Sequence, residues 1–137
     1  MARFNGCIGS SDVTHIGMLS CAAWAQIMHK GYKLNVPSRT YNMTANHSRR
    51  ILGSTMGHPA TLNDKTIVLS DPLIWNVKDG VIPEKFEFML FERYIEGNIV
   101  EVPYIGVYFI VDNGYLAWSC TVPPIKKSYN LRRNKIF

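Results

Sequence analysis

The chain has 137 residues, a net charge of +5 and a pI near 9.2, with 47% apolar and 18% charged residues. This length allows one globular domain with its own core, and the composition excludes an intrinsically disordered chain. No apolar run reaches the length of about 18 residues that a transmembrane helix needs. The N-terminus also lacks the basic start and apolar run of a secretory signal. We therefore expect an intracellular protein, nuclear or cytoplasmic.

The three cysteines, Cys7, Cys21 and Cys120, lie far apart and form no Cys-x-x-Cys pair. Their odd number and wide spacing predict neither a disulfide framework nor a zinc site. We expect reduced thiols that are mostly buried.

The first elements in chain order are an extended segment and a helix. Phe4 to Ile16 is predicted to be extended, although its glycines and serines have low β propensity. Met18 to His29 favours a helix, with Gly31 as its stop. Tyr41 to Asn46 and Arg50 to Thr55 then have the spacing of a β-hairpin, and residues 57–59 are predicted to be a loop.

Two short helices follow. Asn63 is a good N-cap for a helix from Asp64 to Ser70, because its side chain can accept from the first free backbone amides. Asp71 and Pro72 are the preferred N-cap and first residue of a second helix, which Gly80 ends.

The last third of the chain predicts strands. Residues 86–91 form an aromatic segment, and Asn98 to Val102 is a short strand. Ile105 to Val111 is an unbroken apolar run, which is typical of a strand covered on both faces of an α/β sheet. The order of these elements predicts a mixed α/β fold.

Two aspartates end predicted strands, Asp12 in Gly-Ser-Ser-Asp and Asp112 in Ile-Val-Asp-Asn-Gly. Ligands of open α/β sheets gather beyond the carboxyl ends of strands, so neighbouring strands would bring both carboxylates into one site. Such oxygens suit Mg²⁺, and paired ions can support phosphodiester chemistry. Simple turns remain an alternative for both residues, since Asp-Asn-Gly is also a turn signal.

Other kinds of site have weaker support. The histidines, at positions 15, 29, 47 and 58, lack the spacing of a zinc protease. No Gly-x-Ser-x-Gly elbow and no phosphate-binding Gly-x-x-x-x-Gly-Lys loop is present. The scattered tryptophans and tyrosines could stack on bases, but core packing explains them more simply.

Several segments, taken in order, resemble the nuclease domain of PIF/Harbinger-type transposases and DDE superfamily endonucleases. They are Gly9–His15, Lys33–Asn42, Asn46–Leu52, Gly57–Pro59, Asn63–Thr66 and, as the most specific one, Val111–Pro124. The resemblance covers nearly the whole chain. It implies an RNase H-like fold with a mixed sheet and flanking helices, and cutting of DNA with Mg²⁺ or Mn²⁺.

The resemblance also implies roles for individual residues. Asp12 and Asp112 match the first two catalytic, metal-binding aspartates of the family. Asp64 and His15 are expected to support the site without binding the metal. Proteins of this kind often work with a Myb-like DNA-binding protein, which is therefore a possible partner by resemblance.

One departure from the family concerns its third acidic residue, a glutamate beyond the Val-Pro-Pro segment. Residues 125–137 contain neither Glu nor Asp. We therefore expect residues 1–124 to be a partial nuclease domain, incomplete at the C-terminus and inactive alone. Residues 125–137 are expected to be a basic tail that binds DNA through its cations, which are Lys126, Lys127, Arg132 and Arg133.

Two alternatives stay open. The chain could be a non-catalytic remnant of a transposable element that binds DNA or a protein. It could also be the product of a truncated gene without a selected function. A solvated tail that only aids solubility remains the simpler explanation of the cations.

Overall fold

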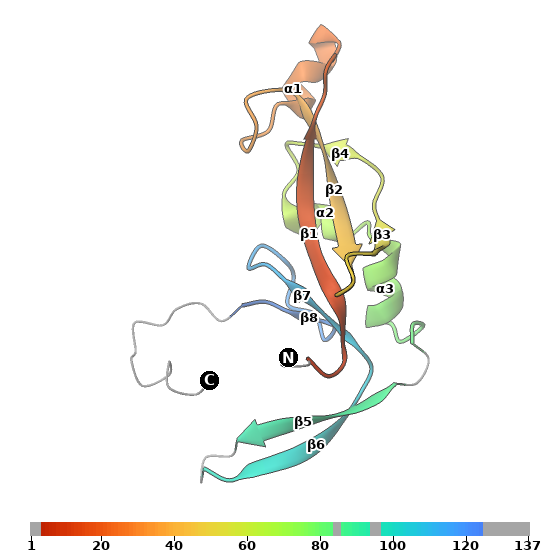
Figure 1. The fold of residues 1–137 in the computed structure, drawn as a ribbon. Coiled ribbons are helices and arrows are strands. Elements are labelled where there is room, and N and C mark those ends of the chain that lie inside the picture. The colour runs from red at the N-terminus through yellow and green to blue at the C-terminus, as the bar shows by residue number, and fades with distance from the viewer. Residues whose placement is uncertain (1–3, 84–85, 94–96, 125–137) are drawn as a thin grey trace.

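A computed structural model describes residues 4–83, 86–93 and 97–124 of the chain (Figure 1). Its centre is a sheet with the strand order β3-β2-β1-β7-β8, to which β4 adds by pairing with β2. The strands are β1 (Cys7–Gly17), β2 (Ser38–Ala45), β3 (Ile51–Ser54), β4 (His58–Pro59), β7 (Tyr108–Val111) and β8 (Thr121–Val122). We refer to these six strands as the main sheet.

The main sheet mixes parallel and antiparallel pairs. β1 runs antiparallel to β2 and parallel to β7, while β8 continues the parallel part beside β7. β1 therefore has a partner on each side, and this pairing explains why a segment with low β propensity forms a long strand. β2 and β3 form the predicted hairpin. The predicted loop at residues 57–59 is wrong in part, because His58 and Pro59 pair with β2.

Helices α2 (Asp64–Val68) and α3 (Pro72–Lys78) pack on the main sheet and begin at the predicted caps. The Asn63 side chain accepts from the Thr66 amide at 2.8 Å, and Asp71 accepts from Leu73 at the same distance. The core joins side chains of both helices to those of β1, β7 and the segments before and after β7. Its members are Val13, Ile67, Val68, Ile74, Val77, Val107, Phe109, Val111, Tyr115 and Cys120. The helices and strands thus share one core, and the predicted α/β class is confirmed.

The buried face of β2 is polar along its whole length. Ser38, Thr40, Asn42 and Thr44 alternate with more exposed residues and are each fully buried. Buried polar groups need hydrogen-bond partners. This face of β2 therefore depends on specific hydrogen bonds, whereas the rest of the core depends on the packing of apolar side chains.

The predicted helix from Met18 to His29 is wrong in its first half. Only a 3₁₀ turn, η1 (Ala23–Ala25), and the single turn α1 (Gln26–His29) form. Neither has a side-chain N-cap, and Trp24 and Ile27 are exposed. Short helices depend on packing of an apolar face, which this segment lacks within the described residues.

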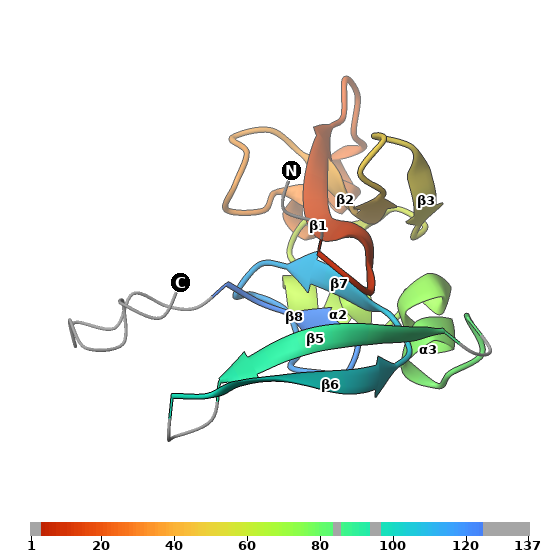
Figure 2. The same cartoon turned by 60° about the horizontal axis from the view of Figure 1, so that its bottom comes forward.

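The predicted single strand from Ile105 to Val111 is also wrong. Gly106, with a φ of 110°, breaks the run into the end of β6 (Ile99–Ile105) and the start of β7. β6 pairs with β5 (Glu87–Arg93) in a separate two-stranded hairpin, which Figures 1 and 2 show beside the main sheet. The apolar run therefore belongs to two sheets.

The mixed main sheet, with its few packed helices, is compatible with an RNase H-like fold. None of the helices in the described part of the chain is long and apolar enough to cross a membrane.

Candidate functional site

The site is built where β1 and β7 run side by side. These strands are parallel, and the last pair of Cα partners is Ser11 with Val111. Asp12 and Asp112 each follow that pair directly, so they occupy equivalent positions on adjacent strands, which are spaced about 4.8 Å apart. Ser11 and Val111 are buried while both aspartates are exposed. The sequence predicted both aspartates at strand ends, and this is wrong for Asp12: Asp112 follows the end of β7, whereas Asp12 lies within β1 and pairs with Met43 of β2.

Each aspartate uses one oxygen locally. Asp12 Oδ1 accepts from the Val13 amide at 2.8 Å, and Asp112 Oδ1 accepts from the Gly114 amide at 2.7 Å. Asp112 therefore does form the turn that was predicted as an alternative to a site role. The turn holds its carboxylate at the end of β7. Both Oδ2 atoms make no hydrogen bond within the described residues, which leaves them available to a ligand.

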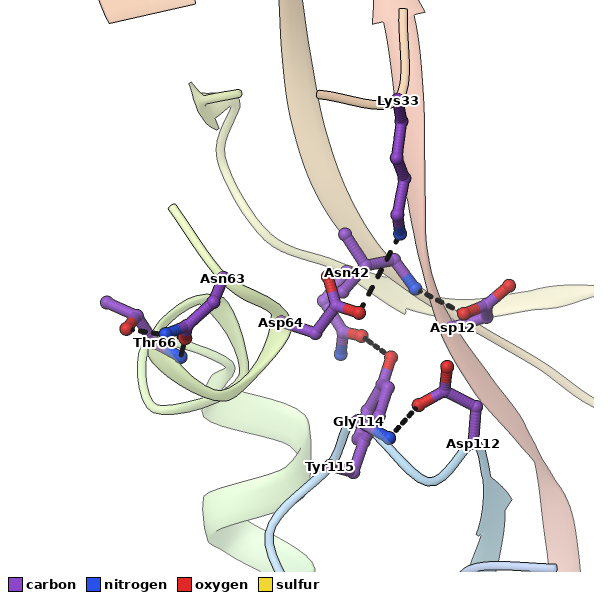
Figure 3. A network of polar contacts seen from close by, with 10 residues as sticks. Asp12, Lys33, Asn42, Asn63, Asp64, Thr66, Asp112, Gly114 and Tyr115 are labelled. Atoms are coloured by element: carbon purple, nitrogen blue, oxygen red, sulfur yellow. Dashed lines mark hydrogen bonds and ion pairs between the residues drawn. The ribbon is translucent and has the colours of Figure 1, made fainter. Parts of the chain in front are cut away.

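Asp64 brings a third carboxylate to the same place from the first turn of α2. A Cβ atom at Gly114 would stand 2.9 Å from Asp112 Oδ1 and 3.1 Å from Asp64 Oδ2. Asp112 Oδ1 and Asp64 Oδ2 are therefore separated by no more than the sum of these two distances. A side chain at position 114 would fill the space between them, which glycine leaves open. Figure 3 shows Asp12, Asp64 and Asp112 directed toward the same region from three different elements.

Asp64 also has a cationic partner. Lys33 Nζ lies 3.7 Å from Asp64 Oδ2, and both side chains are partly shielded from solvent. Among clustered carboxylates a lysine reduces the repulsion that the like charges would otherwise produce. Asp64 therefore already has a cationic partner, and the supporting role predicted for it stays a prediction.

His15 lies farther along β1, on the side of the site where Lys33 lies. Burial lowers the pKa of His15 below its ordinary value of 6.5, and Lys33 lowers it further. Asp64 and Asp12 act in the opposite direction and raise that pKa. Both ring nitrogens are buried without a hydrogen-bond partner in the described part of the chain.

A buried polar network lies directly beneath the carboxylates, and sequence reasoning missed it. Its centre is Asn42, which accepts from Tyr115 and Ser11 and donates to Asp71. Burial raises the pKa of the Tyr115 hydroxyl well above its usual range, so this group stays a hydrogen-bond donor. No local motif marks these residues, because the hydrogen bonds join positions that lie far apart in the sequence.

Two further observations concern metal binding and the basic tail. Among the described residues, no group of three or more His, Cys, Asp or Glu side chains is arranged to hold a metal ion. The four tail cations expected to bind DNA, Lys126, Lys127, Arg132 and Arg133, lie outside the described residues.

A family model with the description "Plant transposon protein" matches residues 1–137. The chain belongs to this plant transposon protein family. The match covers the whole chain and supports the transposase ancestry that the sequence motifs indicated. Searches of curated proteins and of solved structures gave no significant match.

Proposed function

We propose that this member of the plant transposon protein family is a DDE-type nuclease domain that acts on DNA phosphodiester bonds. Asp12 and Asp112 are the proposed ligands of Mg²⁺ or Mn²⁺. The observation that supports the proposal is the parallel register of β1 and β7, in which Asp12 and Asp112 each follow the last pair of Cα partners, in a protein of transposon origin.

The donor chemistry fits such an ion. Carboxylate oxygens are the ligands that Mg²⁺ prefers, and the ion keeps several waters, so two protein ligands can suffice for binding. Gly114 leaves room beside Asp112, since a Cβ there would come within 2.9 Å of its Oδ1. When bound, the metal would supply Lewis-acid activation of a phosphate oxygen and of a water molecule or hydroxyl.

The residues of the chain have separate tasks in this proposal. The Gly114 amide orients the Asp112 carboxylate, and the Val13 amide orients that of Asp12. Lys33 holds Asp64 by an ion pair at 3.7 Å and offsets negative charge near the place where a DNA phosphate would approach. Residues 1–137 provide two of the three carboxylates that the resemblance implies, so we expect these residues alone to be inactive.

A Mn²⁺ titration tests the proposal. We expect the wild type to bind Mn²⁺, and Asp12→Asn or Asp112→Asn to weaken binding at least about tenfold, since even residues behind metal ligands have effects of that size. Asp79→Asn is the matched control, because Asp79 is an exposed aspartate that pairs with Lys78 at the end of α3. Equal Mn²⁺ binding by the wild type and both site variants would refute the proposal and favour the non-catalytic remnant.

DNA is the proposed substrate, and the basic tail is proposed to contact its backbone. Reversing the charges of Lys126, Lys127, Arg132 and Arg133 is expected to weaken duplex binding and to flatten its salt dependence between about 50 and 200 mM salt. Unchanged affinity and salt dependence would remove the tail from the proposal and leave the metal site untouched.

A further inference from the structure

We infer that Tyr115 is a positioning residue that fixes the loop carrying Asp112 to β2 through Asn42. Its meaning for catalysis rests on the proposed function, but the anchoring itself is a property of the fold. Figure 3 shows Tyr115 reaching from this loop to Asn42, beside Asp112. The Tyr115 hydroxyl donates to Asn42 Oδ1 at 2.5 Å, and both side chains are buried.

The partners of Asn42 determine the orientation of its amide. Asn42 Nδ2 donates to Asp71 Oδ2 at 2.5 Å, and only the nitrogen of a side-chain amide can donate a hydrogen bond. The amide nitrogen must therefore face Asp71, and the amide oxygen must face Tyr115. Asp71 is held in turn, because its other oxygen accepts from the Leu73 and Ile74 amides at the start of α3.

The same amide oxygen also reaches the strand of Asp12. Ser11, which directly precedes Asp12, donates to Asn42 Oδ1 at 3.1 Å. Ser11 in turn accepts from Thr44 at 3.0 Å, so each polar group of this chain of hydrogen bonds has a partner. One side chain of β2 thus links the residue before Asp12 to the residue three positions after Asp112.

Tyr115 is the only member of this network that belongs to the Asp112 loop, among the residues that the structure describes. Within the loop the contacts are local, between Asp112 Oδ1 and the Gly114 amide and between the Asp112 carbonyl and the Tyr115 amide. Local bonds fix the shape of the turn but not its position against β1 and β2. The Tyr115 hydroxyl supplies that longer connection from inside the protein.

The test is Tyr115→Phe, which removes the hydroxyl and keeps the ring in the core. The matched control is Thr40→Val, because Thr40 is also fully buried on β2 and, within the described part of the chain, its hydroxyl bonds only backbone carbonyls of β4. Two quantities are measured on the full chain: amide hydrogen exchange of residues 113–116 without metal, and the affinity for Mn²⁺.

Tyr115→Phe should speed exchange at residues 113–116 about fivefold relative to Thr40→Val, which is the effect of losing one buried hydrogen bond locally. It should also weaken Mn²⁺ binding about tenfold, as loss of a residue that orients a ligand does. Thr40→Val should change neither quantity, although it can lower global stability.

Equal exchange in the two variants would overturn the anchoring. Faster exchange with the Mn²⁺ affinity of Thr40→Val would overturn the positioning role and leave only a structural one. If the wild type binds no Mn²⁺, the proposed function fails, and the exchange comparison still decides whether Tyr115 holds the loop.

Discussion

The main sheet and the β5–β6 hairpin are both rich in apolar strand residues, yet they bury them to very different extents. Phe109 in β7 has 0% of its surface exposed, whereas Phe91 in β5 has 72% and Ile105 in β6 has 78%. The main sheet has α2 and α3 packed on it, while the hairpin pairs only with itself among the described residues. The comparison shows that an apolar strand pattern predicts a strand but does not predict what covers it.

The two regions meet at one aromatic contact. The Phe88 ring of the hairpin lies 5.9 Å from the ring of Tyr104 and 6.2 Å from that of Tyr108 at the start of β7. Gly6 lies under the same ring, since a Cβ at this position would stand 2.4 Å from its atoms. Beside this contact an apolar groove of about 310 Å³ runs between the hairpin and β8. Phe88 therefore connects the hairpin to the start of β7.

The largest expected difference in stability is between two Phe→Ala substitutions, one in each region. Phe109→Ala should lower the free energy of unfolding by about 3–5 kcal/mol, because it removes a fully buried ring and leaves a cavity. Phe91→Ala should change it by no more than about 0.5 kcal/mol, because that ring is largely in solvent. Urea unfolding of both variants measures the difference. Similar losses would show that the hairpin is covered in solution.

A medium effect is expected where the regions meet. Gly6 has a φ of 78°. Gly6→Ala should lower the free energy of unfolding by about 1–3 kcal/mol, because the new side chain strains the backbone and displaces Phe88. Gly80→Ala is the matched control, since Gly80 has a φ of 74° with nothing within 4 Å of an added Cβ. Denaturant unfolding of both gives the contribution of the Phe88 contact as their difference. If the two variants lose equal stability, Phe88 does not pack on Gly6.

The smallest effect is a pH dependence that arises in the main sheet at His15. The folded protein lowers the pKa of His15 below 6.5, so the unfolded chain binds more protons in the window between the two values. The free energy of unfolding should therefore fall as the pH drops below about 6.5, and the loss should end below the folded pKa. Urea titrations of the wild type and His15→Gln should show a smaller loss in the variant. An identical pH dependence would contradict the burial of this ring.

Sequence reasoning predicted the features that local chemistry determines. Asn63 and the Asp71-Pro72 pair mark helix starts because their side chains and fixed dihedral suit the first turn, whatever packs on the helix. The hairpin of β2 and β3 was also predicted from spacing alone. Asp12 and Asp112 were singled out because the sequence predicted both at strand ends, which holds for Asp112 after β7 but not for Asp12 within β1. The parallel pairing of β1 and β7 is what places the two residues on adjacent strands.

The features that were missed depend on distant contacts. The break at Gly106 is invisible in an apolar run, because glycine tolerates both a strand and a φ of 110°. The helix predicted from Met18 has good propensity but no core to pack against. Asn42 resembles an ordinary polar strand residue until Tyr115, Ser11 and Asp71 are placed around it.

We propose that Asp12 and Asp112 share a divalent ion. The most direct measurement is a crystal structure with Mn²⁺, in which anomalous scattering locates the metal without reference to activity. We expect a peak bound by both carboxylates, beside Gly114. A well-ordered site with no peak between the two aspartates, or a peak bound by other residues alone, would contradict it.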